Sequence, residues 1–340
     1  MNQGLKNTGS FLASSAEKTQ ALRTLFQWIE KRYGGLPFDK GPAAEIITCD
    51  KVLQTSDLKR LMQHQATAIH VKGFYDLQAA VELGKELAHE AGVRNWKVST
   101  SRGLESSDVS TLGEHAPYNV VAASPKGIRL QAEDEYFDGV QKELQRRRTV
   151  ATEHGVRHRL WPLDLLRLSL DEAWPAGAGL ARESKGKKRP YSGGLPRIMK
   201  GPTRWRKGFI HVDEMGILNP QKGLFSANIY LQMPDDSREN ADALTPQKIL
   251  DIWPVAIRSR WDWYRNALLL SGLSSQDTED QMRLRFCLGD PLSIAVAPGD
   301  LILICAQRPH AAVGFQSGVR VSLQCFVQHN GLDQRLLIDS

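Results

Sequence analysis

The sequence predicts an α+β protein in which helices flank a β-rich core. In the N-terminal half, apolar residues recur at helical spacing, for example at Leu22, Leu25 and Ile29. In the C-terminal half, apolar residues instead alternate with polar ones, as in residues 226–233 and 319–327. Because the first period is typical of helices and the second of strands, the chain is expected to change from mainly helical to mainly β along its length.

Residues 15–195 are expected to form helices and short strands that pack on the core, after a flexible N-terminus at residues 1–14. A capping box formed by Ser14 and Glu17 predicts the start of the first helix, and Asp76 predicts the cap of a later one. Each helix carries its apolar residues on one face, which is typical of scaffold helices.

Short apolar runs and polar stretches complete the N-terminal half. Residues 45–49 and 68–71 predict strands, whereas the polar residues 99–114 predict a loop. Residues 133–148 and the segment that begins at Pro162 predict helices. All of these elements are expected to surround the β-rich core.

A basic loop at residues 181–194 leads into the core. It contains Lys187, Lys188 and Arg189 and has little apolar surface to bury, so we expect it to be mobile. Two interpretations remain open: a lid or plain loop beside the catalytic strand, and a nucleic-acid contact. The absence of interleaved aromatic residues favours the first.

Composition narrows the class of protein. The chain has 340 residues, of which 41% are hydrophobic and 24% charged, as in ordinary soluble globular proteins with a substantial core. No long apolar run or signal-peptide pattern occurs, so we expect a cytoplasmic protein without a membrane segment. The 4 cysteines lack C-x-x-C spacing, which disfavours structural zinc and a disulfide framework. The net charge of +6 permits an acidic partner, but the region around the basic loop accounts for much of it.

The chemistry is expected to centre on residues 208–231. His211 and Asp213 lie two apart in a β-branched and aromatic context, so a strand would point both side chains to one face. His310 follows a Pro-Gly-Asp turn at residues 298–300 and an apolar strand. Two imidazoles and one carboxylate make the facial triad that holds Fe(II) and leaves coordination positions open. These three side chains are therefore the predicted catalytic residues and metal ligands.

The ordered motifs resemble those of the Fe(II)/2-oxoglutarate-dependent oxygenases. The set reads His211-Val-Asp213, then His310, then Arg320-Val-Ser322. It is similar to that family's pattern of His-x-Asp, a distal His and an Arg-x-Ser about ten residues on. A bare His-x-Asp is common by chance, whereas the ordered set is much more specific.

The resemblance implies a double-stranded β-helix core, the jelly-roll or cupin-like fold, at residues 196–330. Within this core, the aromatic-rich residues 235–285 are expected to form a helical insertion. Residues 331–340 are expected to be a C-terminal tail. The implied architecture is thus a jelly-roll catalytic core with flanking N-terminal helices.

The resemblance also implies the cofactors and the reaction. Fe(II) would act with 2-oxoglutarate as co-substrate and O2, and a C–H bond of the substrate would be hydroxylated with release of succinate and CO2. Arg320 and Ser322 would hold the far carboxylate of 2-oxoglutarate. The strand that follows the His-x-Asp motif is expected to present Asn228, Tyr230 and Gln232 on one face, and the first two would hydrogen-bond the co-substrate. Desaturation, epoxidation and ring chemistry stay open.

Substrate contacts are predicted at four further positions. Arg204 or Arg206, just before the His-x-Asp strand, is placed to hold a substrate carboxylate through a bidentate pair, with solvated edge charges as the alternative. Trp96 and Tyr118 are candidates for the border of the pocket, with structural packing as the alternative. The expected substrate is a small molecule, either an amino acid, an amino-acid derivative or a natural-product intermediate. The expected assembly is a monomer or homodimer.

Two other functions stay open. A nucleic-acid demethylase of the same fold would carry a second Arg downstream of Arg320, and residues 321–328 lack it, which disfavours nucleic acid as a partner. A non-enzymatic cupin-like metal-binding protein would concentrate several His and a Glu on its first metal strand, whereas this chain has His211 and Asp213 there. Iron-dependent conversion of 2-oxoglutarate to succinate would separate an oxygenase from a binding protein.

Overall fold

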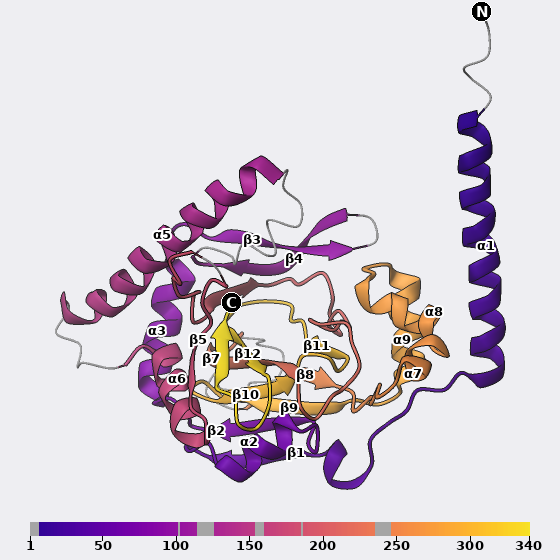
Figure 1. Ribbon diagram of the computed structural model, residues 1–340. Helices are drawn as coiled ribbons and strands as arrows, with labels where there is room; N and C mark the ends of the chain where they lie inside the picture. The colour runs from indigo at the N-terminus through magenta and orange to yellow at the C-terminus, as the bar shows by residue number, and fades with distance from the viewer. Residues whose placement is uncertain (1–6, 101–102, 114–125, 154–159, 185, 235–245) are drawn as a thin grey trace, which may run out of the picture.

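The computed structural model shows a protein of mixed helix and strand with one large and one small sheet (Figure 1). The residues that the structure describes are 7–100, 103–113, 126–153, 160–184, 186–234 and 246–340. The predicted combination of helices and strands is confirmed at this level.

The large sheet spans the molecule. Its strands are β1 (Ile46–Asp50), β2 (Ala68–Lys72), β3 (Arg94–Thr100), β4 (Gly103–Thr111), β5 (Ala178–Leu180), β6 (Leu195–Lys200), β7 (Gly223–Gln232), β10 (Leu301–Cys305), β12 (Val319–His329) and β13 (Leu336–Asp339). They run in the order β1-β2-β10-β7-β12-β6-β4-β3, and β13 pairs with both β12 and β5. The pairs β10–β7, β7–β12 and β12–β6 are antiparallel, so alternate residues of these central strands share a face.

The small sheet packs against one face of the large sheet. Its strands are β8 (Gln247–Ile252), β9 (Leu292–Val296) and β11 (His310–Ala312), in the order β11-β8-β9. Ile252 and Ile294 of the small sheet share a buried apolar cluster with Ile302 and Tyr230 of the large one. The two sheets therefore form a sandwich.

Helices cover the other face of the large sheet and the ends of the sandwich. The helices are α1 (Asn7–Tyr33), α2 (Thr55–Met62), α3 (Leu77–His89), α5 (Lys126–Glu153), α6 (Pro162–Ala173), α7 (Arg260–Tyr264), α8 (Ala267–Leu270) and α9 (Thr278–Leu288), with the short 3-10 helices η1 (Gly41–Ala44) and η2 (Ser271–Ser274). Leu61, Leu87 and Leu166 of α2, α3 and α6 share a second buried cluster with Ile229 and Leu323 of the sheet. In the part of the chain that is described, no helix has the length and apolar composition that crossing a membrane requires.

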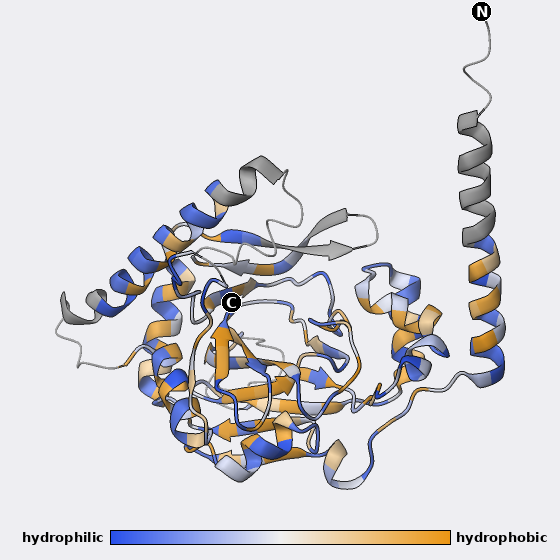
Figure 2. Ribbon diagram, viewed as in Figure 1, coloured by the Kyte–Doolittle hydropathy of each residue, from blue (hydrophilic) through white to orange (hydrophobic). Residues whose placement is uncertain are grey.

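Alternation along the central strands separates packing residues from polar ones. On β12, Val321 and Leu323 are fully buried in the cluster beneath the helices, and Arg320 and Ser322 take the opposite face. Figure 2 shows these strands as largely hydrophobic and the outer helices as mixed. The inner, small-sheet side of the large sheet therefore carries the polar side chains predicted to be functional.

On β7, the row of polar side chains on the inner face ends at Tyr230 and does not include Gln232, contrary to the prediction. A bulge makes Ser322 pair with Tyr230 and Val321 pair with Gln232, two residues further along β7. Gln232 then lies on the helix side, because a Cβ built on Gly84 of α3 would come within 2.9 Å of the Cβ of Gln232. The prediction that Gln232 shares the polar face is wrong, since strict alternation fails at a bulge.

Four segments differ from the predicted elements. Residues 103–111, predicted as loop, form β4, and residues 247–252, predicted inside a helical insertion, form β8. Residues 336–339 of the expected tail form β13, and residues 7–14 of the expected flexible N-terminus belong to α1. Each of the three missed strands has one partner far away in the sequence, which is β6 for β4, β9 for β8 and β5 for β13. Local composition does not reveal such partners.

The basic loop at residues 181–194, described apart from one residue, is anchored to α5. Arg189 donates hydrogen bonds to Glu183 at 2.8 Å and to Asp134 of α5 at 2.6 Å. The ring of Tyr191 packs on Phe137 of α5, with a distance of 5.0 Å between ring centroids. These contacts hold the loop beside α5.

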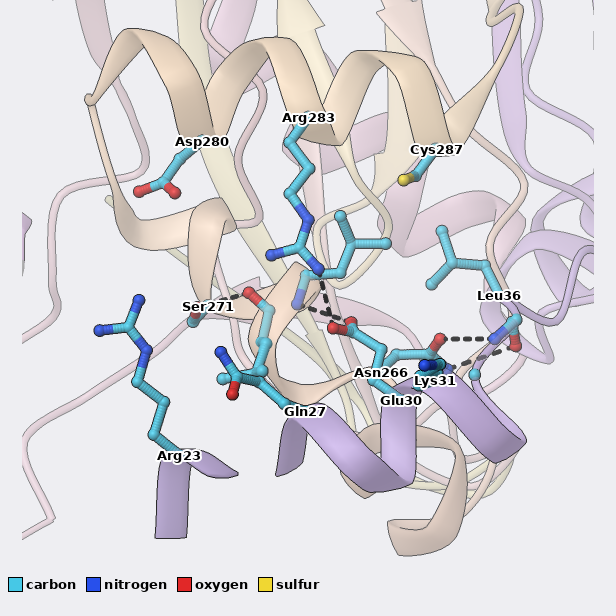
Figure 3. A pocket seen from close by; sticks show the side chains of 14 residues that line it. Arg23, Gln27, Glu30, Lys31, Leu36, Asn266, Ser271, Asp280, Arg283 and Cys287 are labelled. Carbon is cyan, nitrogen blue, oxygen red and sulfur yellow. Dashed lines mark hydrogen bonds and ion pairs between the residues drawn. The ribbon is translucent and has the colours of Figure 1, made fainter. Parts of the chain in front are cut away.

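A pocket of about 810 Å³ lies between α1 and the helices α8 and α9 (Figure 3). Glu30 of α1 accepts hydrogen bonds from Arg283 of α9 at 2.8 Å and from the backbone N–H of Leu269 at 3.1 Å. Asn266 bonds with Gly35 just after the helix. These bonds fasten the C-terminal end of α1 to the body, while its N-terminal end extends away from the other elements (Figure 1). None of the predicted site residues lines this pocket.

Candidate metal centre

His211, Asp213 and His310 converge at one end of the sandwich. Their ligand atoms lie within 4.8 Å of one another. The Asp213 carboxylate lies 3.8 Å from Nε2 of His211 and 3.4 Å from Nε2 of His310. Two ligand atoms that are each about 2.1 Å from one ion and at right angles lie roughly 3 Å apart, so small side-chain movements close the cluster on a metal ion. The side chains are 31%, 17% and 8% exposed, in the order of the chain, which leaves the centre accessible from one side.

Backbone pairing sets the spacing of the cluster. His211 and His310 form an antiparallel bridge, in which each backbone N–H donates to the carbonyl of the other at 3.0 and 2.9 Å. The backbone N–H of Asp213 donates to the carbonyl of Ala306 at 2.9 Å. His310 also pairs with Ile252 of β8, which ties the cluster to the small sheet. The three side chains are therefore brought together by the sheet and not only by their own contacts.

Each imidazole is held in one tautomer. Nδ1 of His211 lies 2.9 Å from the carbonyl oxygen of Phe209, and Nδ1 of His310 lies 2.8 Å from that of Arg308. A carbonyl oxygen can only accept, so each Nδ1 carries the hydrogen and donates it. In the neutral rings the lone pair is then on Nε2, which faces the Asp213 carboxylate. This is the orientation that a metal ligand requires.

The segment before His211 is held by helix α9 and by a glycine. The side chain of Gln281 accepts a hydrogen bond from the N–H of Ile210 at 2.8 Å and donates to its carbonyl at 3.0 Å. Gly208 has a φ of 78°, and a Cβ there would lie 2.5 Å from the carbonyl oxygen of Ala312. Sequence reasoning did not predict the role of Gln281, because nothing local distinguishes it from other polar helix residues.

Electrostatics favours the protonation states that a metal needs. Burial opposes ionisation of Asp213, but the hydrogen bond with His310 and the electrostatic effects of His310, His211 and Arg197 outweigh burial and lower its pKa to about 2. Burial lowers the pKa of His211 to about 4, with a further contribution from His310. For His310, burial is outweighed by the contact with Asp213, which raises its pKa. At neutral pH the centre thus offers a carboxylate and at least one neutral imidazole.

No model of a known protein family matches the chain, and no curated protein matches it either. Solved structures with a detectable likeness include an N-substituted L-amino acid dioxygenase in complex with alpha-KG from Burkholderia ambifaria AMMD, which is 11% identical with a TM-score of 0.38 over 73% of this chain and 100% of that chain. A 2OG-Fe(II) oxygenase family oxidoreductase from Burkholderia pseudomallei is 13% identical, with a TM-score of 0.34 over 86% of this chain and 99% of that chain. The alpha-ketoglutarate-dependent carbocyclase SnoK from nogalamycin biosynthesis is 13% identical, with a TM-score of 0.39 over 85% and 99% of the two chains. With TM-scores below 0.5, the assignment of function rests on the residues of the site.

Arg320 and Ser322 lie on the inner face of β12. The guanidinium of Arg320 donates to the carbonyl of Val313 at 2.9 Å and to the sulfur of Met199 at 2.7 Å. It also lies over the ring of Phe315, 5.3 Å from the centroid. Burial lowers the pKa of this guanidinium. Since a thioether is a weak acceptor, Arg320 keeps donor capacity for an anion that enters the sandwich.

Asn228 and Tyr230 line the same inner face from β7. The amide of Asn228 donates to the hydroxyl of Ser226 at 3.2 Å, and Gln324 of β12 donates to that hydroxyl at 2.6 Å. Burial raises the pKa of Tyr230 to about 12, against the opposing effect of nearby arginines. The phenol therefore stays protonated at neutral pH and can donate a hydrogen bond. Whether these residues contact a co-substrate stays a prediction.

The predicted substrate residues Arg204 and Arg206 bond to side chains outside the cluster. Arg204 is exposed, and its guanidinium donates to the side chain of Gln276 at 3.1 Å. Arg206 is also exposed and bonds to the side chain of Gln316. The side chain of Trp96 and the whole of Tyr118 lie outside the described residues. A role for these four residues in substrate binding stays a prediction.

Arg197 is the inner-face residue whose role sequence reasoning missed. It is half-buried on β6 and lies directly opposite Ser322 of β12. Burial lowers its pKa to about 10, while Asp213 and Tyr230 act in the opposite direction. The local feature in the sequence that could have drawn attention to Arg197 is its position as a charged residue next to the apolar Ile198. The position of Arg197 on the inner face depends on the register between β6 and β12, which only the structure shows.

Proposed function

We propose that this chain is an Fe(II)- and 2-oxoglutarate-dependent oxygenase that hydroxylates a C–H bond of a small molecule. The observation that carries the proposal is the convergence of Nε2 of His211, Nε2 of His310 and the carboxylate of Asp213 from separate segments. Two imidazole nitrogens and one carboxylate without a thiolate suit Fe(II), and the exposure on one side leaves room for further ligands. The donor set therefore fits the ion.

The residues of the inner face bind and orient the reactants in this proposal. When bound, an iron centre of this kind supplies oxidation of a C–H bond by O2, with conversion of 2-oxoglutarate to succinate and CO2. Arg320 exchanges the Met199 sulfur for the far carboxylate of 2-oxoglutarate, and Ser322 and Tyr230 offer hydroxyl donors beside it. The apolar residues between the sheets exclude water from the reacting end.

We further infer that the two facing sheets are the double-stranded β-helix implied by the motifs, with its limits at residues 196–330. Support comes from the polar inner face of β12 and β7 and from the small sheet that carries His310. In this arrangement the large sheet provides the anion-binding residues, and the small sheet provides His310, with which the segment that carries the other two metal ligands pairs.

The test is metal binding together with turnover. The metal-free protein is titrated with Mn(II) by calorimetry, and iron-dependent succinate formation is measured with a panel of amino acids and their derivatives. His211→Ala and His310→Ala should each lower Mn(II) affinity by at least about 100-fold and abolish succinate formation, because a facial triad has no spare protein ligand.

The control is His89→Ala, which changes an exposed histidine of α3 whose Nδ1 bonds to the carbonyl of Lys85. It should leave both measurements unchanged. Full Mn(II) affinity in His211→Ala would rule out the ligand assignment. Mn(II) binding by the wild type without any iron-dependent succinate would favour a cupin-like binding protein instead.

A further inference from the structure

The turn at residues 305–308, just before His310, contacts two of the three residues of the candidate metal centre. The carbonyl of Ala306 accepts a hydrogen bond from the backbone N–H of Asp213 at 2.9 Å. The carbonyl of Arg308 accepts one from Nδ1 of His310 at 2.8 Å. The backbone N–H of Arg308 closes the turn by donating to the carbonyl of its first residue at 3.1 Å. The position of this turn therefore affects two ligand residues at once.

A buried ion pair holds this turn. The side chains of Arg308 and Asp39 are 0% and 5% exposed, and the guanidinium donates a hydrogen bond to the Asp39 carboxylate at 2.5 Å. The same guanidinium donates to the carbonyl of Val255 at 3.0 Å. Arg258, whose side chain is 50% exposed, also pairs with the carboxylate, at 2.7 Å. The planar fork of Arg308 thus fastens the turn to two other segments of the chain.

Backbone pairing holds Asp39 in its place. Its N–H donates to the carbonyl of Pro254 at 2.8 Å, and its neighbour Phe38 forms an antiparallel bridge with Val255. The residues that it contacts there follow β8 directly, and β8 pairs with the strand that begins at His310. The carboxylate is therefore attached to the same small sheet as the metal centre, which makes it a fixed point for the turn.

The burial of two charges at this turn is not explained by stability alone. A buried ion pair often stabilises a protein no more than apolar side chains of the same volume would, because both charges lose their hydration. Its hydrogen bonds are directional, however, whereas apolar burial is not. Apolar side chains would fill the same space without fixing the direction of the Arg308 carbonyl. That direction matters, because this carbonyl selects the tautomer of His310.

We propose that the ion pair between Asp39 and Arg308 is a positioning device for the candidate metal centre. This inference rests on the proposed function. The pair fixes the turn, and the carbonyls of the turn orient the side chain of His310 and the backbone of Asp213. Both charged residues are positioning residues, since they act through the turn and not on the metal ion. The segment that follows α1 thereby contributes to the geometry of a site formed by the C-terminal half of the chain.

The variants for the test are chosen to preserve the fold. Arg308→Lys keeps a positive charge beside Asp39 but loses the planar fork that also reaches Val255. The double variant Asp39→Leu with Arg308→Met replaces the pair with apolar side chains, an exchange that is often neutral for stability. Both should melt within a few degrees of the wild type. Arg258→Met is the matched control, because it removes the half-exposed partner of the same carboxylate and leaves the buried pair in place.

The first experiment reads the orientation of His310 without metal. NMR of the metal-free protein with isotope-labelled histidine measures how fast the Nδ1–H of His310 exchanges with water, and His310→Ala identifies its signal. The wild type and Arg258→Met should show a protected Nδ1–H, and Arg308→Lys and the double variant should lose the protection. A Nδ1–H that stays protected in both of these variants would overturn the proposal.

The second experiment measures Mn(II) affinity by calorimetry together with the melting temperature. Loss of an outer partner of a metal ligand lowers metal affinity about 10- to 100-fold. Arg308→Lys and the double variant should show such a loss while they remain folded, and Arg258→Met should bind as the wild type does. Full Mn(II) affinity in the folded double variant would overturn the proposal. Loss of the folded state in both variants would also overturn it, because the pair would then serve stability.

The two experiments separate this inference from the proposed function. A wild-type protein that does not bind Mn(II) defeats the metal centre, while the exchange rate of the Nδ1–H of His310 still decides whether the ion pair orients the ring. A wild-type protein that binds Mn(II) as tightly as Arg308→Lys and the double variant do keeps its metal centre and loses the positioning role of Asp39.

Discussion

The histidines of this protein lie in different surroundings, which affect the orientation and the pKa of each ring differently. The metal-centre rings are oriented by backbone carbonyls, whereas His64 is buried with its Nδ1 3.6 Å from the sulfur of Cys305 and its ring stacked on Phe225. Burial, together with the charge of Arg308, lowers the pKa of His64 to about 4. The folded state therefore binds this proton less readily than the unfolded state. The contribution of the neutral His64 to the stability of the folded state is fully present above pH 6.5. It is lost as the pH falls from 6.5 towards 4.

His64→Asn should make the protein less sensitive to acid. The φ of His64 is 59°, a left-handed conformation that Asn adopts more readily than most residues. Between pH 6.5 and 4.5 the free energy of unfolding of the variant should fall by less than that of the wild type, the difference being about 2 kcal/mol. Urea denaturation across this pH range measures the free energy of unfolding of both proteins. His89→Asn, on an exposed helix position, should follow the wild type, and parallel curves for His64→Asn would contradict the assignment.

At the residue scale, the sequence was informative where function depends on local spacing. His211 and Asp213 are recognisable because residues two apart in a strand share a face, and the structure brings both to His310. The roles of Arg197 and Gln281 depend on strand register and on a helix that folds back from later in the chain. No local pattern contains that information.

At the scale of elements, the edge segment that carries His211 depends on helix α9. Gln281 satisfies both the N–H and the carbonyl of Ile210. Gln281→Leu should destabilise the protein by about 1–3 kcal/mol, because it leaves two buried backbone groups without partners. It should also lower Mn(II) affinity by moving His211.

Urea denaturation and calorimetry check the two effects of Gln281→Leu. Gln281→Glu keeps an acceptor for the N–H of Ile210 and should recover part of the metal affinity. Met282→Ala, at a neighbouring α9 position whose residue is 61% exposed, serves as the control and should change neither quantity. An unaltered Mn(II) affinity in Gln281→Leu would show that the helix does not position the ligand.

Elements with clear local signals were predicted well, and strands without such a signal were missed. Asp76 caps α3 by accepting a hydrogen bond from the N–H of Ala79 at 2.9 Å, and Pro162 starts α6, as expected. Strand β8 was missed because it is stabilised by β9 and β11 from much later in the chain. Such pairing is a property of tertiary structure, which overrides local propensity.

At the scale of the whole molecule, the candidate metal centre joins segments that are far apart in the sequence. A ligand that binds only the folded state stabilises it by mass action. Mn(II) at 100 times its dissociation constant should add about 2.7 kcal/mol and raise the melting temperature by a few degrees. His310→Ala should lose this response, and differential scanning calorimetry with and without Mn(II) provides the measurement. A wild-type melting temperature that ignores Mn(II) would contradict the assignment.

The sequence predicted the mixed helix-and-strand architecture and the residues that converge at the candidate metal centre, but not the outline of the molecule. The mixture of helices and strands and the buried positions of Cys305 and Cys325 follow from hydrophobic pattern. The extension of α1 and the pocket beside it follow from hydrogen bonds between Glu30, Asn266 and Arg283 and their partners. Polar contacts of this kind between distant segments have no periodic signature.

The alternation of buried and inner-face residues on β12 limits which sequence changes this protein can accommodate. Leu323 is fully buried under the helices while Ser322 faces the other way, so gaining or losing one codon within the strand would move leucine to the inner face and serine into the core. Point substitutions on the inner face can therefore change the proposed site while the helix-covered layer stays intact. Insertions and deletions within the strand would also disturb the helix-covered layer. Natural or laboratory variation in chain length should therefore be confined to the connecting turns.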